Sequence, residues 1–365
     1  MRPAFSSNGK AASFAILVLV VLSLPLVLTK KLLPPSKEVY SAIPWSIGGF
    51  PYIHDQIFEE KSDIDIAFMG SSVMWWGIDT LQVQRELEKK LGRKAVVRSL
   101  CWNWQGFDPF YKVMKDLLEH RNVRMIVFYD VNSGAPPTAH SQAAHWFRLA
   151  DDPESLSGLN ARTKASFYSS AILSAPKNIP GFLRDNLPAI PSSEVTWRSS
   201  SPQTRNPATR LGSLSLRLRM DKPFEDYLPS TTINPSAGVW LSEATKNQFK
   251  FGKGEVNPTQ ANFIRKISTL ATKHNVKLVY LNLPRKSDMR SPTINEQVFW
   301  PSVFQTEVFV VGIPPLKLFE GVSDEDVWKL YWDFQHFNEN GQKFFTPRIS
   351  PQLTELYERS IQTKH

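Results

Sequence analysis

Short apolar segments alternate with amphipathic segments early in the chain, and this alternation constrains the fold more than any other feature. Three apolar runs, at 64–69, 95–100 and 125–131, have the length and composition of buried strands. Between them, 80–91 and 108–120 carry apolar side chains at helical spacing and are predicted to be helices. Strands and helices that alternate at this spacing predict a parallel sheet.

The same alternation returns near the end of the chain. A helix is predicted at 258–274, and strands are predicted at 276–283 and 308–311. Residues 338–360 are predicted to be mostly helical, with Pro347 and Pro351 kinking or interrupting the helix. The two regular regions together predict one α/β domain of the three-layer flavodoxin-like type, with helices on both faces of a parallel sheet.

A long irregular stretch separates the two regular regions. Residues 133–255 are rich in Ser, Pro, Thr and Arg and show little periodicity. So long a stretch is unusual inside a compact domain. We interpret it as an insertion, acting as a lid or acceptor-binding region, between two halves of the domain at 61–132 and 256–365.

An apolar segment precedes the domain. Residues 11–29 contain no charged side chain, and a helix of this length matches the hydrocarbon core of a bilayer, which is about 30 Å thick. Lys30 and Lys31 follow it in place of a clear cleavage site, which favours an uncleaved signal-anchor. Residues 1–32 are therefore predicted to be one transmembrane helix, and 33–60 a stalk.

Charge and cysteine content limit the classes of function. The net charge is +9, but the basic residues are spread out and form no recognisable nucleic-acid motif, so nucleic acid is not expected as a partner. Basic residues gather locally at 198–222, where we expect a solvated loop; contact with anionic headgroups or an anionic polymer is the alternative. The single cysteine, Cys101, and the spacing of the histidines disfavour a metal site, and no cofactor is expected.

Polar, turn-forming residues follow each of the first three predicted strands, at 70–72, 101–106 and 130–133. In open parallel sheets, ligands bind outside the carboxyl ends of the strands, near a switch in strand order. These three groups should therefore meet in space. A fourth group, Asp-Phe-Gln-His at 333–336, lies directly before the last predicted helix.

These motifs, in this order, resemble the SGNH/GDSL hydrolase superfamily. That superfamily carries Gly-Asp-Ser after the first strand, Gly after the second, Gly-x-Asn-Asp after the third and Asp-x-x-His before the last helix. The matching positions in this chain are Ser72, Gly106, Asn132, Asp333 and His336. The resemblance covers about 64–132 and 258–360.

Two motifs depart from the superfamily pattern. Ser71 replaces the family Asp, and Asp130-Val131-Asn132-Ser133 replaces Gly-x-Asn-Asp. A carboxylate at Asp130 would oppose the negative charge of an oxyanion unless it points away. Gly-Ser-Ser is what the resemblance leads us to expect of the membrane-anchored branch, which includes the Dlt-system D-alanyl transfer protein and the alginate-acetylation proteins.

The chemistry of the residues supports the same reading. A serine hydroxyl such as that of Ser72 is a poor nucleophile until a base takes its proton. His336 is the candidate base, and Asp333 is close enough in sequence to hold its tautomer and stabilise its charged form. The candidate oxyanion donors are the backbone N–H groups of Ser72 and Gly106 and the side-chain amide of Asn132. Taken singly, these residues also fit a helix cap, an ordinary histidine and turn positions.

Four tryptophans crowd the same predicted edge of the sheet, namely Trp75, Trp76, Trp102 and Trp104. They are candidates for contact with a sugar or an acyl chain. Packing beneath the insertion is the alternative.

The resemblance implies a membrane-anchored serine acyltransferase or esterase that moves an acyl group, acetyl by expectation, to or from an envelope or exported glycan. The domain would then lie outside the cytoplasm, in the periplasm or the extracellular space. A multi-span membrane acyltransferase is the candidate partner that supplies the acyl group. The alternative is a catalytically inactive, membrane-tethered binding or assembly factor for polysaccharide export.

Overall fold

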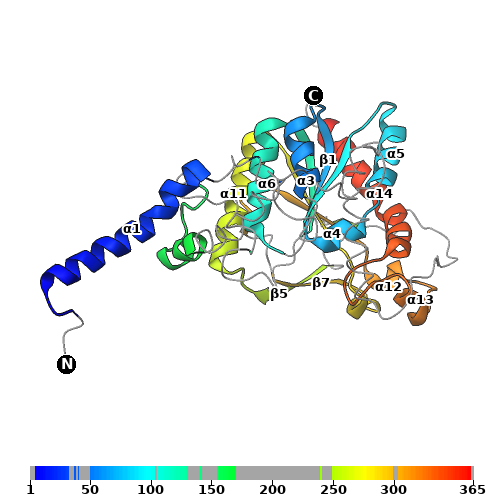
Figure 1. Cartoon of the computed structure of the whole chain (residues 1–365). Coiled ribbons are helices and arrows are strands. Elements are labelled where there is room, and N and C mark those ends of the chain that lie inside the picture. Colours follow the sequence, from blue (N-terminus) through cyan, green and yellow to red (C-terminus); the bar gives the residue numbers. More distant parts are fainter. Residues whose placement is uncertain are drawn as a thin grey trace, which may run out of the picture.

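A computed structural model describes an α/β body and an N-terminal helix that Figure 1 draws apart from it. The described residues are 5–32, 37, 40, 50–102, 105–129, 140, 154–169, 239–240, 249–298 and 303–362.

Within the described residues, a six-stranded sheet forms the centre of the body, in the order β2-β1-β3-β6-β8-β4. Its strands are β1 (Ile64–Gly70), β2 (Val97–Cys101), β3 (Val123–Tyr129), β4 (Val239–Trp240), β6 (Lys277–Leu281) and β8 (Val308–Gly312). All neighbours pair in parallel except β4, which pairs antiparallel with β8. The five parallel strands follow the 2-1-3-4-5 order of flavodoxin-like folds, as expected for doubly wound sheets.

Helices cover both faces of this sheet, which confirms the predicted layers (Figure 1). On one face α6 packs against α11, and on the other α5 packs against α14. These helices are α5 (Thr80–Leu91), α6 (Phe107–His120), α11 (Pro258–His274) and α14 (Glu339–Gln362). Because both faces are covered, every residue of β1 is buried, as its continuous apolar run predicts.

The predicted helix at 80–91 is confirmed, and local signals explain its ends. The Asp79 side chain caps α5 by accepting hydrogen bonds from the N–H groups of Leu81 and Gln82, at 3.0 and 3.2 Å. Gly92 ends the helix in a left-handed conformation, with φ of 64°. In α14, by contrast, Pro347 and Pro351 lie inside one helix and do not interrupt it, and the alternative of a kink stays a prediction.

Shorter elements complete the body. β5 and β7 form a second, two-stranded parallel sheet. The short elements are α3 (Phe50–His54), η2 (Asp55–Glu59), α4 (Ser72–Gly77), β5 (Phe249–Gly254), η6 (Lys286–Asp288), β7 (Ile294–Val298), α12 (Pro315–Leu318) and α13 (Asp324–Trp328).

The last part of the predicted stalk packs into the body. Phe50, Ile53 and Ile57, from α3 and η2, are buried, and η2 lies against α6. Tyr40 is also buried, and its hydroxyl donates a hydrogen bond to Asp116 of α6 at 2.7 Å. These residues therefore belong to the core, where the sequence analysis expected a linker.

The predicted transmembrane segment at 11–29 falls within α1 (Asn8–Leu32). Among the residues that the structure describes, no helix combines the length and the apolar character needed to cross a membrane.

Most of the predicted insertion at 133–255, with the basic cluster at 198–222, lies outside the described residues. Two strands of this range are described: β4 belongs to the six-stranded sheet, and β5 belongs to the two-stranded sheet. The sequence analysis predicted neither strand.

Candidate active site

The first three strands end at the same level of the sheet. Gly70, the last residue of β1, pairs with Cys101 at the end of β2 and with Tyr129 at the end of β3. The N–H of Trp102 donates to the carbonyl of Gly70 at 3.0 Å. The polar groups that follow these strands therefore start side by side at the switch in strand order, where doubly wound folds bind their ligands.

Gly70 makes the sharp turn that leads to the two serines. Its φ is 149°, and a Cβ at this position would collide with the carbonyl oxygen of Tyr129. The N–H of Ser71 donates to that same carbonyl at 3.3 Å, and α4 begins at the next residue, Ser72. The turn thus places Ser72 at the carboxyl edge of the sheet, partly exposed among buried neighbours.

Ser72, His336 and Asp333 form a continuous chain of hydrogen bonds. The Ser72 Oγ lies 2.9 Å from the Nε2 of His336, and the Nδ1 of His336 lies 2.7 Å from an oxygen of Asp333. The other Asp333 oxygen accepts from the N–H groups of Gln335 and His336, both at 2.8 Å. Both Asp333 oxygens therefore have partners, and the carboxylate is fixed with respect to the imidazole.

The electrostatics of Asp333 favour its charged form. Burial raises the pKa of this carboxyl. The hydrogen bond and the charge of His336, together with the N–H bonds from Gln335 and His336, lower the pKa, and their combined effect is larger than that of burial. The net pKa is below the ordinary value for aspartate. An ionised Asp333 accepts the Nδ1–H of His336, which leaves Nε2 free of a proton and able to accept one from Ser72.

The loop that carries Asp333 and His336 is held on several sides. Tyr331 and Phe337 form an antiparallel bridge across it, and the N–H of Trp332 donates to the carbonyl of His336 at 2.8 Å. Asn338 caps α14 by accepting from the N–H groups of Asn340 and Gly341, at 2.9 and 3.0 Å. The histidine therefore sits on a short, closed loop at the start of a long helix.

That helix also binds the segment that carries the serine. Gln342 of α14 donates its side-chain amide to the carbonyl of Ile78 at 2.9 Å. The hydroxyl of Thr346 accepts the N–H of Asp79 at 2.9 Å. Both contacts fix the residues that follow α4, so one helix positions the two parts of the chain that meet at the Ser72–His336 hydrogen bond.

Two of the three predicted oxyanion donors lie in the described residues. The N–H of Ser72 belongs to the first residue of α4, where no preceding turn supplies a partner. Gly106 precedes the first residue of α6, with φ of 159°. Asn132, and Asp130 beside it, lie outside the described residues.

The predicted substrate contacts of the tryptophans do not fit their positions. Trp75, Trp76 and Trp102 are 1%, 2% and 0% exposed, so their rings cannot stack on a sugar. Trp76 packs edge-on against Trp332, with ring centroids 6.1 Å apart. Packing, the alternative reading, therefore describes these three, and Trp104 lies outside the described residues.

Sequence reasoning missed the burial of Asp108, which lies two positions after Gly106. Asp108, in the first turn of α6, is fully buried, and burial raises the pKa of its carboxyl to about 7. In the sequence it stands on an amphipathic helix directly after a turn, which predicts an ordinary helix-start acid. Only the packing of the folded chain reveals its burial.

A cavity of about 160 Å³ lies beside the triad loop. Its wall includes Tyr129, whose carbonyl accepts from Ser71, and Arg285. The next residue after Arg285, Lys286, donates its N–H to the carbonyl of Phe334 at 3.0 Å, which joins this wall to the triad loop. The wall carries charged, hydroxyl and amide side chains, namely Arg285, Asp288, Ser287, Asn282 and Asn295.

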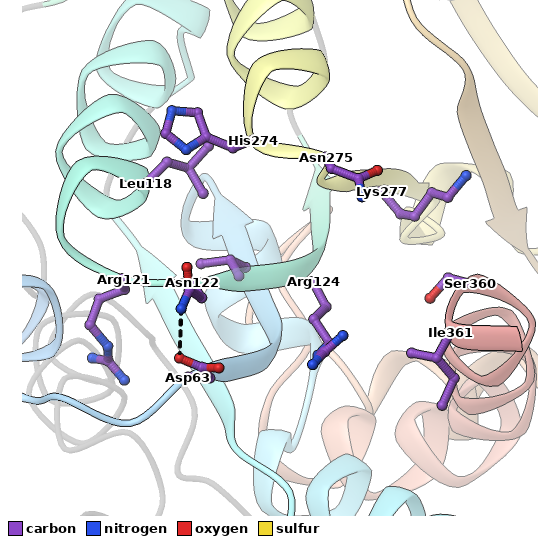
Figure 2. Close-up of a pocket in the computed structure, with 11 residues that line it drawn as sticks. Asp63, Leu118, Arg121, Asn122, Arg124, His274, Asn275, Lys277, Ser360 and Ile361 are labelled. Atoms are coloured by element: carbon purple, nitrogen blue, oxygen red, sulfur yellow. Dashed lines mark hydrogen bonds between the residues drawn. The ribbon is translucent and has the colours of Figure 1, made fainter. Parts of the chain in front are cut away.

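A second cavity, of about 450 Å³, lies at the opposite edge of the sheet (Figure 2). It is formed where β3 and β6 begin and where α11 and α14 end, with Arg124 and Lys277 in its wall. Asn122 and Asp63 both line it, and the side-chain amide of Asn122 donates a hydrogen bond to Asp63 at 3.0 Å, drawn as the dashed line in Figure 2. The triad lies at the carboxyl edge of the sheet, so this cavity is separate from it.

Comparisons with protein-family models, with curated proteins and with solved structures found no match. The class of site is therefore defined by its geometry alone, as a Ser-His-Asp hydrogen-bond chain at the carboxyl edge of a doubly wound parallel sheet.

Proposed function

We propose that this chain is a serine acyltransferase or esterase with an SGNH-like domain, acting on an envelope or exported glycan. The observation that carries the proposal is the hydrogen-bond chain from the Ser72 Oγ through His336 to Asp333, at 2.9 and 2.7 Å. Hydrogen-bond reach between nucleophile, base and orienting acid is the signature of an activated serine.

In the proposed reaction, the Ser72 Oγ attacks the carbonyl carbon of an acyl ester while the Nε2 of His336 takes the hydroxyl proton. The carbonyl oxygen becomes an oxyanion, which the N–H groups of Ser72 and Gly106 and the amide of Asn132 stabilise. As the ester bond breaks, His336 gives its proton to the leaving alcohol, and an acyl-enzyme remains. An acceptor hydroxyl then repeats these steps in reverse and releases Ser72.

The acceptor decides between the two activities. A sugar hydroxyl gives acyl transfer, and water gives ester hydrolysis. The cavity of about 160 Å³ beside the triad loop supports a polar acceptor, since Arg285 and Asp288 balance each other in charge and neutral amides complete the wall. Such a wall offers hydrogen bonds to hydroxyl groups without selecting for a net charge.

We propose that α1 anchors the domain to a membrane, with the domain outside the cytoplasm and a multi-span membrane acyltransferase as donor partner. Support comes from the uncharged run at 11–29 and from the exposure of its apolar side chains. Exposed ones include Phe14, Ile16, Leu17, Leu19 and Val21. Exposed apolar surface of this extent is unfavourable in water and calls for an apolar environment.

The function is tested by labelling the full-length protein with a fluorophosphonate, which reacts with activated serines. The expected result is one adduct, located at Ser72 by peptide mass spectrometry. Protein denatured before labelling is the control, because the reaction requires the folded triad. A well-folded protein that takes no label would favour the alternative, an inactive binding or assembly factor for polysaccharide export.

The anchor is tested separately, in spheroplasts of a bacterial host. Protease added outside intact cells is expected to digest the body, at residues 40–365, and the protein is expected in the membrane fraction. A variant that lacks residues 1–32 behind a cleavable export signal is expected in the soluble periplasmic fraction. Full protection of the body from protease would contradict both the topology and the glycan substrate.

A further inference from the structure

The exposed apolar side chains of the body gather around one cavity. Beyond the N-terminal segment that includes α1, the large apolar side chains that are exposed among the described residues are Leu316, Trp328 and Phe334. Leu316 follows Pro315, which lines the cavity of about 160 Å³ beside the triad loop. Lys286, next in sequence to a residue of the same wall, contacts the other two. Single exposed apolar residues are ordinary, but three around one cavity mark a binding surface.

Lys286 joins the two exposed rings to the cavity and to the triad loop. It follows Arg285 of the cavity wall, and its N–H donates to the carbonyl of Phe334 at 3.0 Å. Its Nζ lies 4.3 Å from the centroid of the Trp328 ring, in a cation–π contact. Phe334 stands two residues before His336, so the Cα atoms of the two are at most about 7 Å apart. Phe334 therefore borders the candidate active site, and Trp328 lies across the same lysine from it.

The backbone that carries each ring is fixed, although the ring itself is exposed. Phe334 is 63% exposed, but the N–H groups of the two residues after it bond to Asp333, each at 2.8 Å. Trp328 is 54% exposed, but it follows Val327, which is fully buried and holds α13 against the body. Rings on a fixed backbone lose little conformational freedom when a ligand binds, which favours binding.

Flat rings beside a polar cavity fit a sugar chain. A pyranose ring has a face of C–H groups that packs on an aromatic ring, and a rim of hydroxyl groups that need hydrogen bonds. The cavity wall offers such bonds through Asn282, Ser287 and Asn295, and it carries one charge of each sign, on Arg285 and Asp288. An acyl chain would remove these polar groups from water without replacing its hydrogen bonds, which is unfavourable. The balanced charges of the wall favour a neutral chain over an anionic one.

We propose that Trp328 and Phe334 form an aromatic platform on which a neutral glycan chain stacks as it enters the cavity, so that the acceptor is a chain of pyranose units. Two rings on separate segments call for a ligand longer than one sugar. This inference rests on the proposed function, because it names the class of acceptor for that reaction.

The test measures the binding of neutral oligosaccharides, which does not depend on catalysis. The probes are cellotetraose and fully N-acetylated chitotetraose, titrated at millimolar concentrations into the full-length protein by isothermal calorimetry. The wild type is expected to bind at least one of them. Phe334→Ala and Trp328→Ala are each expected to weaken that binding by roughly threefold to tenfold, the usual contribution of an aromatic contact beyond its buried area.

Matched variants show whether stacking on a ring is responsible. Phe334→Tyr keeps the flat ring and should bind nearly as well as the wild type, whereas Phe334→Leu keeps apolar bulk without the ring and should behave like Phe334→Ala. Phe14→Ala removes another ring, 53% exposed on α1, and should leave the affinity unchanged. Thermal melts show that each variant is folded. Equal affinity in the wild type, Phe334→Ala and Trp328→Ala, or no binding of either probe, would overturn the platform.

An acyl chain is the other ligand that exposed rings could hold, and p-nitrophenyl octanoate tests for it. Suppose that Phe334→Ala and Trp328→Ala raise the KM for this ester but leave the oligosaccharide affinity unchanged. The rings then bind the acyl group, and the platform for a glycan is overturned.

Two outcomes separate this inference from the function on which it rests. A protein that takes no fluorophosphonate label but loses oligosaccharide affinity with either ring would support the platform and contradict the enzyme. Labelling at Ser72, with unchanged oligosaccharide affinity in both ring variants, would leave the proposed function intact and contradict the platform alone.

Discussion

Replacing Ser72 with alanine is expected to lower the rate of acyl transfer by roughly 10⁴–10⁶-fold, the usual loss when a triad loses its nucleophile. The Ser72 Oγ is the atom that His336 can deprotonate, at a distance of 2.9 Å. Alanine is a good helix former, and position 72 is only partly buried at the start of α4, so the fold should survive. The measurement is the burst and steady-state rate with p-nitrophenyl acetate, together with fluorophosphonate labelling.

Ser71→Ala is the matched control, because it removes the neighbouring hydroxyl of the same turn. Ser71 is buried, and its Oγ has no hydrogen-bond partner among the described residues. Its contacts to Tyr129 and Trp75 use backbone atoms, which alanine retains. We expect a rate within about tenfold of the wild type and no loss of stability. Full activity in Ser72→Ala, or equal and complete loss in both variants, would contradict the assignment of Ser72.

Asp333→Asn is expected to lower the acylation rate by roughly 10⁴-fold while the fold is retained. An amide in place of the carboxylate cannot hold the Nδ1–H of His336 in the same way and favours the wrong imidazole tautomer. The backbone N–H groups of Gln335 and His336 can still bond to the remaining oxygen, so the loop should keep its shape. Asp324→Asn, which changes an exposed aspartate on α13, is the control and should stay close to the wild-type rate. A rate for Asp333→Asn within about tenfold of the wild type would contradict the orienting role.

The pH dependence of Asp333 has a definite sign. Its pKa in the folded protein is below the ordinary value, so its contribution to stability is present above the unfolded pKa of about 3.9. That contribution is lost as the pH falls through the lower folded pKa. Asp333→Asn should therefore unfold with a weaker acid dependence than the wild type, as followed by thermal melts between pH 3 and 6. Melting temperatures that fall equally in both proteins over this range would show that the carboxylate adds nothing to stability.

Much of the fold could be predicted because its signals are local. The helices at 80–91 and 258–274 have a periodic apolar stripe and side-chain caps, and the structure gives both with the predicted bounds. The parallel sheet followed from the strand–helix alternation. In such a sheet the carboxyl ends of the strands lie together at the edge where ligands bind. For this reason the sequence alone could place Ser72 at that edge.

Other features depend on contacts that no local pattern specifies. Trp75, Trp76 and Trp102 stand near the predicted edge in sequence, but their burial depends on which elements cover them. Strand β4 has two residues and pairs with β8, far away in the chain. The burial of Asp108 likewise arises from His140 and from helix packing. Such long-range contacts override what a residue's neighbours in sequence predict.

The hydrogen bond between Ser72 and His336 joins residues 264 positions apart, and the helix that fixes them comes last in the chain. Ribosomes add about 5–20 residues per second, so the base is synthesised roughly 15–50 s after the nucleophile. During that interval the serine has no general base and reacts with esters no faster than an ordinary alcohol. Under the proposed function, acyl chemistry would begin only once α14 has been synthesised and holds the segment after α4, so a chain that stops before this helix would not react with acyl donors.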